Sequence, residues 1–374
     1  MKGRFFEHKN FTRNILQSTH FLSPNSHMTH ILNERHDVYE IYSGKLLESG
    51  YPRVDLTLNA NKFRKLEIKE ELGLRNCRKV VLYAPTWRGT HGHVGIDSEK
   101  LRKDLETINK LDNIELIFRG HALLQEEILN LGLKVKIVPA SIDTNELLSV
   151  VDILITDYSS IMFDFMPTRK NIILYVYDYD QYVMERGVYF NLDELPGLKC
   201  HSIDEVCLAI KKSSEYIDNK KLFDRFVPYE DGCVTKKVVE AVFERNYSHV
   251  KVVNKKVDKR KSLLIYGGPF MGNGITTSLI NLISNIDRNK YNITVAIDPG
   301  AIMKEVGRVS KFSLLPEINV VARVGRMNLG LDDKYIHSIN NHEYGYLNNR
   351  MKNVLVESWH MEFLRIFGQG KFDS

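Results

Sequence analysis

The middle of the chain alternates between short apolar runs and segments with the charge pattern of helices, and this alternation most constrains the fold. A charged helix is expected at 61-NKFRKLEIKEELGL-74, and further helices near 98–110, near 122–131 and from Ser159. Apolar strands separated by such helices predict a parallel, doubly wound sheet that binds its ligands at the carboxyl ends of the strands. The strands are expected at 79–87, 114–120, 134–139, 152–156 and 171–177.

A second strand–turn–helix pattern begins near residue 262. The segment 262-SLLIYGGPFMGNGITTSLINLISNI-286 has the order of a buried strand, a glycine-rich turn and an amphipathic helix, and 291–298 follows as another strand. This order predicts the opening of another Rossmann-like unit. We expect the remaining chain to Ser374 to be irregular and too short to complete a large domain. The predicted class is therefore α/β, with a second, partial Rossmann-like unit at the C-terminus.

Changes in pattern divide the chain into four parts. Gly50-Tyr51-Pro52-Arg53 interrupts the chain before the main sheet, and the basic stretch 251-KVVNKKVDKRK-261 precedes the second unit. That stretch fits either a solvated linker or a contact with anionic lipid. The predicted parts are 1–57, the sheet domain 58–246, the linker 247–261 and the partial unit 262–374.

The composition excludes several classes of protein. The 374 residues are 43% hydrophobic and 26% charged, as in globular proteins, and no apolar stretch approaches the length of a membrane span. A net charge of +5 suits an anionic substrate or a membrane surface, and without a strongly basic stripe no nucleic acid is expected. The cysteines lack CxxC spacing, so neither a zinc site nor a disulfide framework is indicated; they are Cys77, Cys200, Cys207 and Cys233.

Polar residues follow three of the predicted strands. Because the carboxyl ends of parallel strands lie on one edge of a sheet, we expect these residues to converge. Cationic groups and hydroxyls in one cleft suit a phosphorylated ligand. The three groups are Thr86-Trp87-Arg88, Arg119-Gly120-His121 and Thr156-Asp157-Tyr158-Ser159-Ser160.

The last of these groups stands where a strand becomes a helix. The free N–H groups of a first helical turn attract phosphate oxygens, and Ser159 and Ser160 add hydroxyl donors. Asp157 either caps the helix or accepts a hydroxyl of a ligand. Arg119 and His121 share one face of an extended strand, which fits a phosphate clamp, a general acid–base histidine or a structural histidine.

Five motifs in order resemble those of a known family. They are 80-VVLYAPTWRGT-90, Arg119-Gly120-His121, 155-ITDYSSIMFDF-165, 174-LYVYDYDQY-182 and 230-EDGCVTKKVVEAVF-243. Together they resemble the CDP-glycerol glycerophosphotransferase family of teichoic acid polymerases and primases, over roughly residues 1–246. The segments 11–25 and 49-SGYPRVDL-56 are similar to the part of that family that precedes the donor-binding domain.

The resemblance implies a GT-B-like fold of two Rossmann-like domains and a defined reaction. Glycerol phosphate, or ribitol phosphate, would pass from CDP-glycerol or CDP-ribitol to a hydroxyl of a growing, lipid-linked wall polymer, with release of CMP. It also implies an enzyme that is peripherally attached to the cytoplasmic face of the cell membrane and needs no tightly bound cofactor or metal. Residues 58–246 would then be the CDP-polyol donor domain.

The resemblance also implies roles for individual residues. His121 would be catalytic and, with Arg119, would contact the donor pyrophosphate, while Asp164 lies one turn further along the helix that begins at Ser159. The implied substrate-binding residues are Arg119, Thr156, Asp157, Ser159, Ser160 and Asp164, with Thr86, Trp87 and Arg88 in the adjacent loop.

Other hypotheses are compatible with the sequence. The family's Trp-His-Gly-Thr-type motif does not occur in it, so we expect 1–57 to be the remnant of an acceptor-side domain, and a truncated, non-catalytic donor-binding protein is one alternative. The segment 264–298 resembles the N-terminal half-domain of a nucleotide-sugar glycosyltransferase, so such an enzyme of wall polymer synthesis is another.

Overall fold

A computed structural model gives the fold, and the chain forms two compact units. One unit is Ser49–Val250, and the other combines Met1–Glu48 with Lys251–Ser374. The expected parts 1–57 and 247–261 are thus each divided between the two units. The structure describes residues 5–36, 41–86, 88–90, 93–94, 97–120, 128, 135–186, 188, 190–212, 219–253, 258–298, 318–323, 325–342 and 348–374.

A parallel sheet of six described strands forms the centre of the unit Ser49–Val250. The strand order is β10-β9-β8-β3-β6-β7, and every neighbouring pair is parallel. The predicted parallel sheet is confirmed, whereas β10 was missed because three residues carry too little pattern. The strands are β3 (Lys79–Tyr83), β6 (Ile114–Phe118), β7 (Lys136–Ile137), β8 (Ile153–Thr156), β9 (Asn171–Tyr175) and β10 (Leu198–Cys200).

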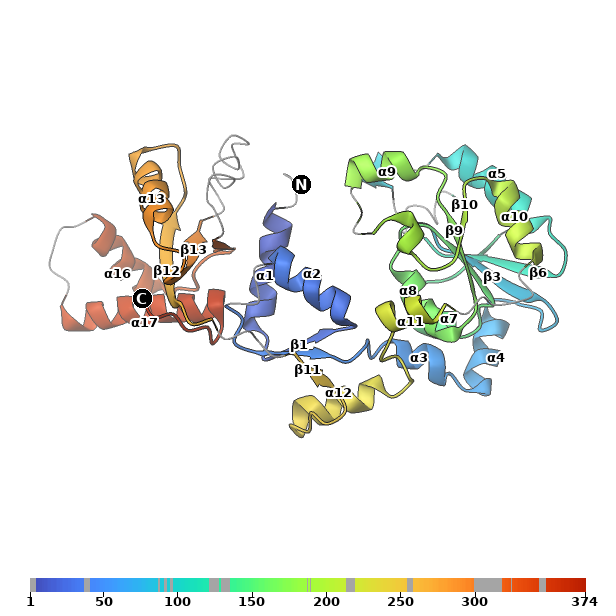
Figure 1. The fold of residues 1–374 in the computed structure, drawn as a ribbon, viewed down its shortest axis with the longest axis horizontal. Helices are drawn as coiled ribbons and strands as arrows, with labels where there is room; N and C mark the ends of the chain where they lie inside the picture. The colour runs from blue at the N-terminus through green and yellow to red at the C-terminus, as the bar shows by residue number, and fades with distance from the viewer. Residues whose placement is uncertain are drawn as a thin grey trace. The chain divides into compact units, whose positions relative to one another are not determined.

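Helices cover both faces of this sheet (Figure 1). Side chains alternate along β3, so Val80 and Leu82 enter one core, and Val81 and Tyr83 enter the other. Because both faces of β3 are buried, its sequence is a continuous apolar run. The first core contains residues of α4 (Lys62–Glu71), α7 (Thr144–Leu148), α8 (Ile161–Phe165) and α11 (Lys220–Phe226); the second contains residues of α5 (Ser98–Asn109) and α10 (Ile203–Lys212).

Helix starts follow from short polar residues. The Asn61 side chain accepts a hydrogen bond from Arg64 N at the start of α4, and Asp97 accepts one from Lys100 N at the start of α5. The remaining elements of the unit are α3 (Val54–Asn59), β4 (Gly89–Thr90), β5 (His93–Val94), the 3-10 helices η2 (Met166–Thr168) and η3 (Leu192–Glu194), α9 (Tyr179–Arg186) and α12 (Val234–Phe243).

The chain reverses its direction across the sheet between β3 and β8. From β3 it passes to β6 and β7 on one side, then returns to β8, β9 and β10 on the other. The loops that leave the carboxyl ends of β3 and β8 therefore diverge, which is where open α/β sheets bind their ligands. These loops contain Thr86 and Arg88 on one side and Asp157 to Ser160 on the other.

The second unit contains a smaller Rossmann-like sheet. Its strands β12 (Lys261–Gly268), β13 (Tyr291–Ile297) and β14 (Asn319–Ala322) are parallel, and α13 (Gly274–Asn285) follows β12. The predicted second, partial Rossmann-like unit is confirmed. A further sheet joins β1 (His20–Ser23), β2 (Lys45–Glu48) and β11 (Lys251–Val252), so a strand lies within the predicted linker.

The two ends of the chain share one hydrophobic core in this unit. Ile15 and Leu16 of α1 (Phe5–Gln17) are buried in a cluster with Val321 and Phe367. Gly368 makes this possible, because a Cβ there would stand 2.3 Å from the carbonyl oxygen of Leu16. The N-terminal segment is therefore a structural part of the C-terminal unit, which sequence alone presented as a separate block.

The expected irregular C-terminal region is instead helical. The described elements there are α16 (Leu331–His342) and α17 (Asn349–Phe367). In the N-terminal part of the same unit, α2 (Ser26–His36) follows β1. Asn348 accepts a hydrogen bond from Met351 N, so asparagine serves here as a helix cap. None of the described helices has the length and apolar character needed to cross a membrane.

Candidate functional site

The two loops at the reversal point are joined through Asp157. The Asp157 carboxylate accepts hydrogen bonds from Thr86 N at 2.9 and 3.0 Å and from Thr86 Oγ1 at 2.5 Å. Thr156 Oγ1 donates to the carbonyl oxygen of Ala84 at 2.6 Å, and the Thr156 side chain is fully buried. Thr156 and Asp157 thus hold the β3 loop against the β8 loop, rather than presenting free groups at the surface.

Arg88 lies between two carboxylates. Its Nη1 is 2.7 Å from Asp157 Oδ2, its Nε donates to Asp178 Oδ2 at 2.8 Å, and its Nη2 donates to Asp178 Oδ1 at 3.1 Å. Burial alone would lower the pKa of this guanidinium, but hydrogen bonds to Asp178 and the charge of Asp157 outweigh burial and raise it. Arg88 is therefore a permanently charged link between three strand ends.

Two tyrosines complete the surroundings of Arg88. Tyr158 OH donates to Asp178 Oδ1 at 3.0 Å, and the rings of Tyr158 and Tyr182 stack with centroids 4.0 Å apart. The Arg88 guanidinium carbon is 5.1 and 5.0 Å from these two centroids, within the range of cation–π attraction. Asp178 and Tyr182 lie in the motif 174-LYVYDYDQY-182, and Tyr158 lies in the motif 155-ITDYSSIMFDF-165.

The hydrogen bonds at the start of α8 differ from those of the predicted helix cap. Ser159 Oγ accepts a 3.4 Å hydrogen bond from Ile161 N, whereas Ser160 is the N-cap residue and makes no side-chain capping bond. The prediction that Asp157 caps this helix is wrong, because its carboxylate is bonded to Thr86, Arg88 and Tyr158 N. α8 has only five residues, so its dipole adds little, and Ser160 is the exposed hydroxyl of the pair.

Asp164 forms a second ion pair near this helix. Arg53 donates to it in bidentate fashion, with Nε at 3.0 Å from Oδ2 and Nη2 at 2.9 Å from Oδ1. The Arg53 guanidinium also lies over the Tyr51 ring at 4.1 Å. Burial raises the pKa of Asp164, although Arg53 opposes this shift.

Glu230 is a buried carboxylate in the loop before α12. Its oxygens accept backbone hydrogen bonds from Tyr51 at 3.3 Å and from Tyr229 at 3.2 Å. Burial raises its pKa to about 7, and these backbone bonds only partly oppose the shift. The motifs 49–56 and 230–243 contain Arg53 and Glu230, but neither residue is predicted for a site. The partners of Arg53 and of Glu230 include residues far away in the chain, which a motif does not show.

Arg119 extends the same edge of the sheet. Its backbone N–H donates to Tyr83 O at 3.1 Å, and its Nη1 donates to the carbonyl oxygen of Ile142 at 2.7 Å. Burial lowers the pKa of the Arg119 guanidinium. His121 and Trp87 lie outside the described residues, so the predicted clamp of Arg119 and His121 stays a prediction.

The described part of this edge is richer in carboxylates than in free cations. Arg88 is held between Asp157 and Asp178, and Arg53 is held by Asp164. Such an arrangement fixes loops in place and offers oxygens to hydroxyl donors of a ligand. Among the predicted residues, Ser160 is exposed, and Ser159, Thr86, Arg88 and Arg119 are partly exposed.

Comparison with known proteins identifies the family. The model of the CDP-Glycerol:Poly(glycerophosphate) glycerophosphotransferase family matches residues 2–244. The chain belongs to this family. The glycerophosphotransferase match spans every loop of the reversal point and both partners of each ion pair described above.

Individual relatives agree with this assignment. The chain is 35% identical over 243 residues to a teichoic acid poly(glycerol phosphate) polymerase of Bacillus spizizenii, covering 62% of this chain and 61% of that protein. It is 32% identical to a teichoic acid glycerol-phosphate transferase of Staphylococcus aureus, covering 60% of each. The chain thus spans about 60% of the length of these two relatives.

A solved structure of this glycerophosphotransferase family has the same fold over the matched region. It is a histidine-to-asparagine variant of the wall teichoic acid polymerase TagF soaked with CDPG, with a TM-score of 0.53 and 28% sequence identity. The likeness covers 63% of this chain and 59% of that one. It supports the Rossmann-like, GT-B-like class assigned to the chain.

Proposed function

We propose that this protein transfers glycerol phosphate from CDP-glycerol to a hydroxyl of a growing teichoic-acid-type wall polymer and releases CMP. The observation that carries the proposal is the family match over residues 2–244, which includes the loops at the reversal point of the sheet. We propose glycerol phosphate rather than ribitol phosphate, because the names of both relatives above specify glycerol phosphate.

Each part of the described site has a role in this proposal. Asp164 accepts hydroxyl groups of the donor, and Ser159 and Ser160 donate to its phosphates. Arg88 and Asp178 fix the loops around these groups rather than bind substrate. Phosphoryl transfer depends chiefly on positioning and on stabilising charge, so a rigid loop framework contributes directly to the rate.

His121 and Arg119 complete the proposed site. Both residues contact the donor pyrophosphate, and His121 is the catalytic residue of the pair. Arg119 follows β6, the neighbour of β3, so it belongs to the same edge as Thr86 and Asp157. Trp87 stands between Thr86 and Arg88 in the loop.

The proposal places the protein at the cytoplasmic face of the cell membrane. A water-soluble nucleotide donor and a polymer anchored in lipid can meet only at that surface. The basic segment 251–261 supports peripheral attachment, since lysine and arginine side chains are attracted to anionic lipid.

A direct assay tests the proposal. The full chain is incubated with CDP-glycerol and a lipid-linked acceptor analogue, and CMP release and polymer growth are measured beside calorimetric binding of CDP-glycerol. His121→Ala should lower turnover by roughly a hundredfold or more, as expected for a lost general acid or base. His201→Ala, at an exposed histidine between β10 and α10, is the matched control. Binding without turnover would instead identify a donor-binding protein, and absence of binding would refute the proposal.

A further inference from the structure

A cavity of about 580 Å³ lies beside β10, the last strand of the sheet, and is separate from the site above. It is lined by the first residues of β9, by the loop before β10 and by α10, whereas the candidate site follows the carboxyl ends of the strands. None of the predicted site residues lines it. Its volume is in the range of cavities that hold small organic ligands.

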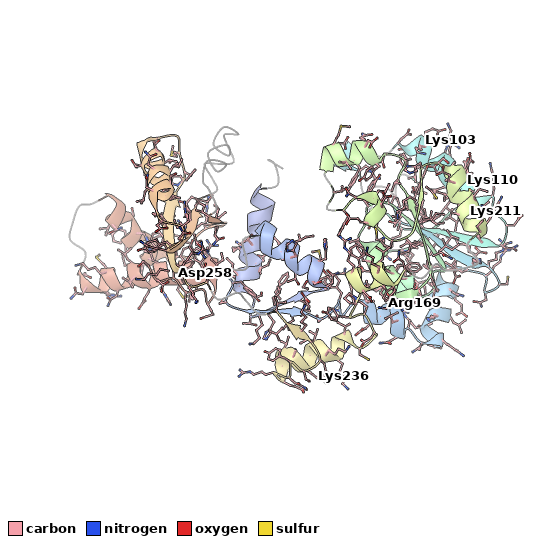
Figure 2. All side chains as sticks on the ribbon, in the orientation of Figure 1. Lys103, Lys110, Arg169, Lys211, Lys236 and Asp258 are labelled. Carbon is pink, nitrogen blue, oxygen red and sulfur yellow. The ribbon has the colours of Figure 1, made fainter. Side chains whose placement is uncertain are left out.

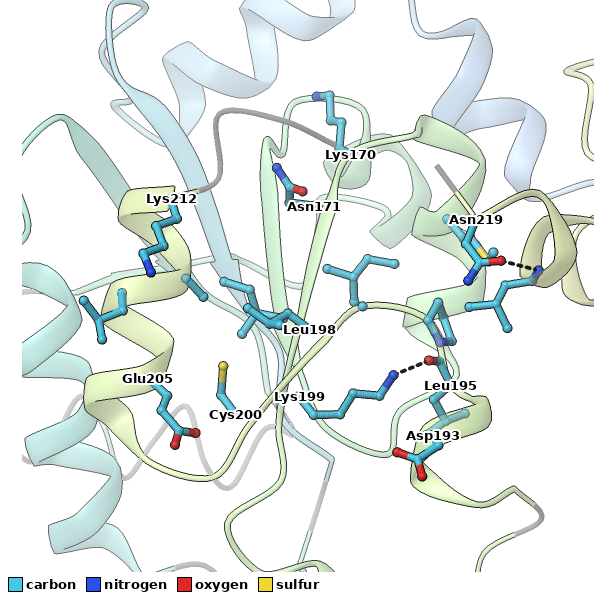
Figure 3. A pocket seen from close by; sticks show the side chains of 18 residues that line it. Lys170, Asn171, Asp193, Leu195, Leu198, Lys199, Cys200, Glu205, Lys212 and Asn219 are labelled. Carbon is cyan, nitrogen blue, oxygen red and sulfur yellow. Dashed lines mark hydrogen bonds between the residues drawn. The ribbon is translucent and has the colours of Figure 1, made fainter. Parts of the chain in front are cut away.

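The middle of the cavity is apolar (Figure 3). Leu198 of β10 and Leu208 of α10 line it and are 57% and 53% exposed. Ile172 and Leu195 also line the cavity and are buried. Large apolar side chains left open to water beside a cavity mark a surface that gains free energy when an apolar group covers it.

Lys199 gives the cavity a cation that lacks an anionic partner. Its Nζ donates to the carbonyl oxygen of Leu195 at 2.7 Å, and among the described residues no carboxylate lies within ion-pair distance of it. Burial lowers the pKa of this amine, while the more distant charge of Asp193 opposes the shift. A partly buried ammonium without a counter-ion is unfavourable, and an incoming anion would relieve that cost.

Asp193 also lines the cavity but forms no ion pair with Lys199 among the described residues, and the remaining charged residues are differently placed. Lys170 is paired with Asp152 at 3.2 Å, and Glu205 accepts a hydrogen bond from His201 N. Lys212 and Lys199 lie on opposite sides of the apolar middle of the cavity (Figure 3). The two lysines therefore mark two distinct positions for a charged head group.

We propose that this cavity binds an amphiphile with one phosphate head group, which pairs with Lys199 while its apolar chain covers Leu198 and Leu208. A phosphate supplies several charged acceptor oxygens to the ammonium, and the chain removes the exposed leucine surface from water. The proposal concerns a second site and does not depend on the donor chemistry.

Binding of n-decyl phosphate to the full chain tests the proposal. Calorimetry below the micelle concentration should detect binding of this probe, and clearly weaker binding of n-decanol and of inorganic phosphate. Lys199→Gln should weaken binding roughly tenfold, the effect of losing a charge-assisted hydrogen bond. Leu198→Asp should abolish binding and is expected to fold, because that side chain is largely exposed.

Matched controls separate the head-group position from general charge effects. Lys211→Gln removes an exposed charge on α10, the helix that carries Leu208 and Lys212. Lys211 lies outside the cavity, so this variant should leave binding unchanged (Figure 2). The proposal fails if n-decyl phosphate does not bind, if decanol binds as well, or if Lys212→Gln weakens binding while Lys199→Gln does not. CDP-glycerol affinity should be the same in all these variants, which keeps this test separate from that of the proposed function.

Discussion

Arg88 and Lys199 are two cations in the same unit with opposite surroundings. Arg88 is held by the carboxylates of Asp157 and Asp178, whereas the Lys199 amine donates to a single backbone carbonyl. The pKa of Arg88 is raised, because its ionic hydrogen bonds outweigh burial, and the pKa of Lys199 is lowered by burial. A cation that is paired with carboxylates, such as Arg88, fixes a loop. A cation without an anionic partner, such as Lys199, favours binding of an anion.

The largest effect is expected from Arg88→Ala. The substitution leaves the buried Asp157 and the partly buried Asp178 without their cation, which should lower the free energy of unfolding by about 3–5 kcal/mol. Urea unfolding followed by circular dichroism measures this. Lys103→Ala, at an exposed position of α5 (Figure 2), is the control and should change the value little. A loss below about 1 kcal/mol, as for a surface ion pair, would refute the structural role.

Glu230→Gln tests a buried carboxylate. No ion pair is formed by Glu230 or by Lys199 among the described residues. The pKa of Glu230 is raised from 4.5 to about 7, so between these values the folded state binds more protons than the unfolded state. Its contribution to stability is therefore present below about pH 4.5 and is lost as the pH rises towards 7, by about 3 kcal/mol. Glu230→Gln should remove this pH dependence from the unfolding free energy. The same slope in variant and parent would contradict the assignment.

Asp164→Asn should weaken binding of CDP-glycerol about tenfold, because an amide is a poorer acceptor for ligand hydroxyls than a carboxylate. Isothermal calorimetry measures this affinity. Asp180→Asn, at an exposed position in α9, is a control of the same chemical change. Equal affinities of the parent and the Asp164→Asn protein for CDP-glycerol would show that Asp164 does not bind the donor and only pairs with Arg53.

The smallest effect should come from Lys199→Met and should have the opposite sign to that of Arg88→Ala. Removing a partly buried, unpaired ammonium should raise the free energy of unfolding, by up to about 1 kcal/mol. Thermal unfolding without added ligand measures it, with Lys211→Met as the control. A clear loss of stability would show that Lys199 is structurally compensated after all.

Much of the fold was predictable because its signal is local. The apolar runs at β3, β6, β8 and β9 are continuous, since helices bury both faces of each strand. β10, α7 and α11 were missed, because elements of three to seven residues carry little periodicity, and the ten-residue helices α10 and α12 were not predicted either. The asparagine-rich C-terminal region was misjudged for another reason: asparagine marks turns and helix caps alike.

The candidate site was predictable in place but not in detail. Parallel strands present their carboxyl ends at one edge, so Thr86 and Asp157 were expected to converge, and they are hydrogen-bonded. The partners that decide what each charge does were not predictable. Asp178 is 90 residues from Arg88, and Arg53 is 111 residues from Asp164.

The family, the parallel sheet and the loops that leave it can all be predicted from the sequence, because they depend on local patterns and on motifs in a fixed order. The ion pairs of Arg88, the lack of one at Lys199 among the described residues, and the core shared by the two ends of the chain become visible only in the folded protein. The physical reason is that the energy of a charge or an apolar side chain depends on its neighbours in space, which chain order alone does not specify.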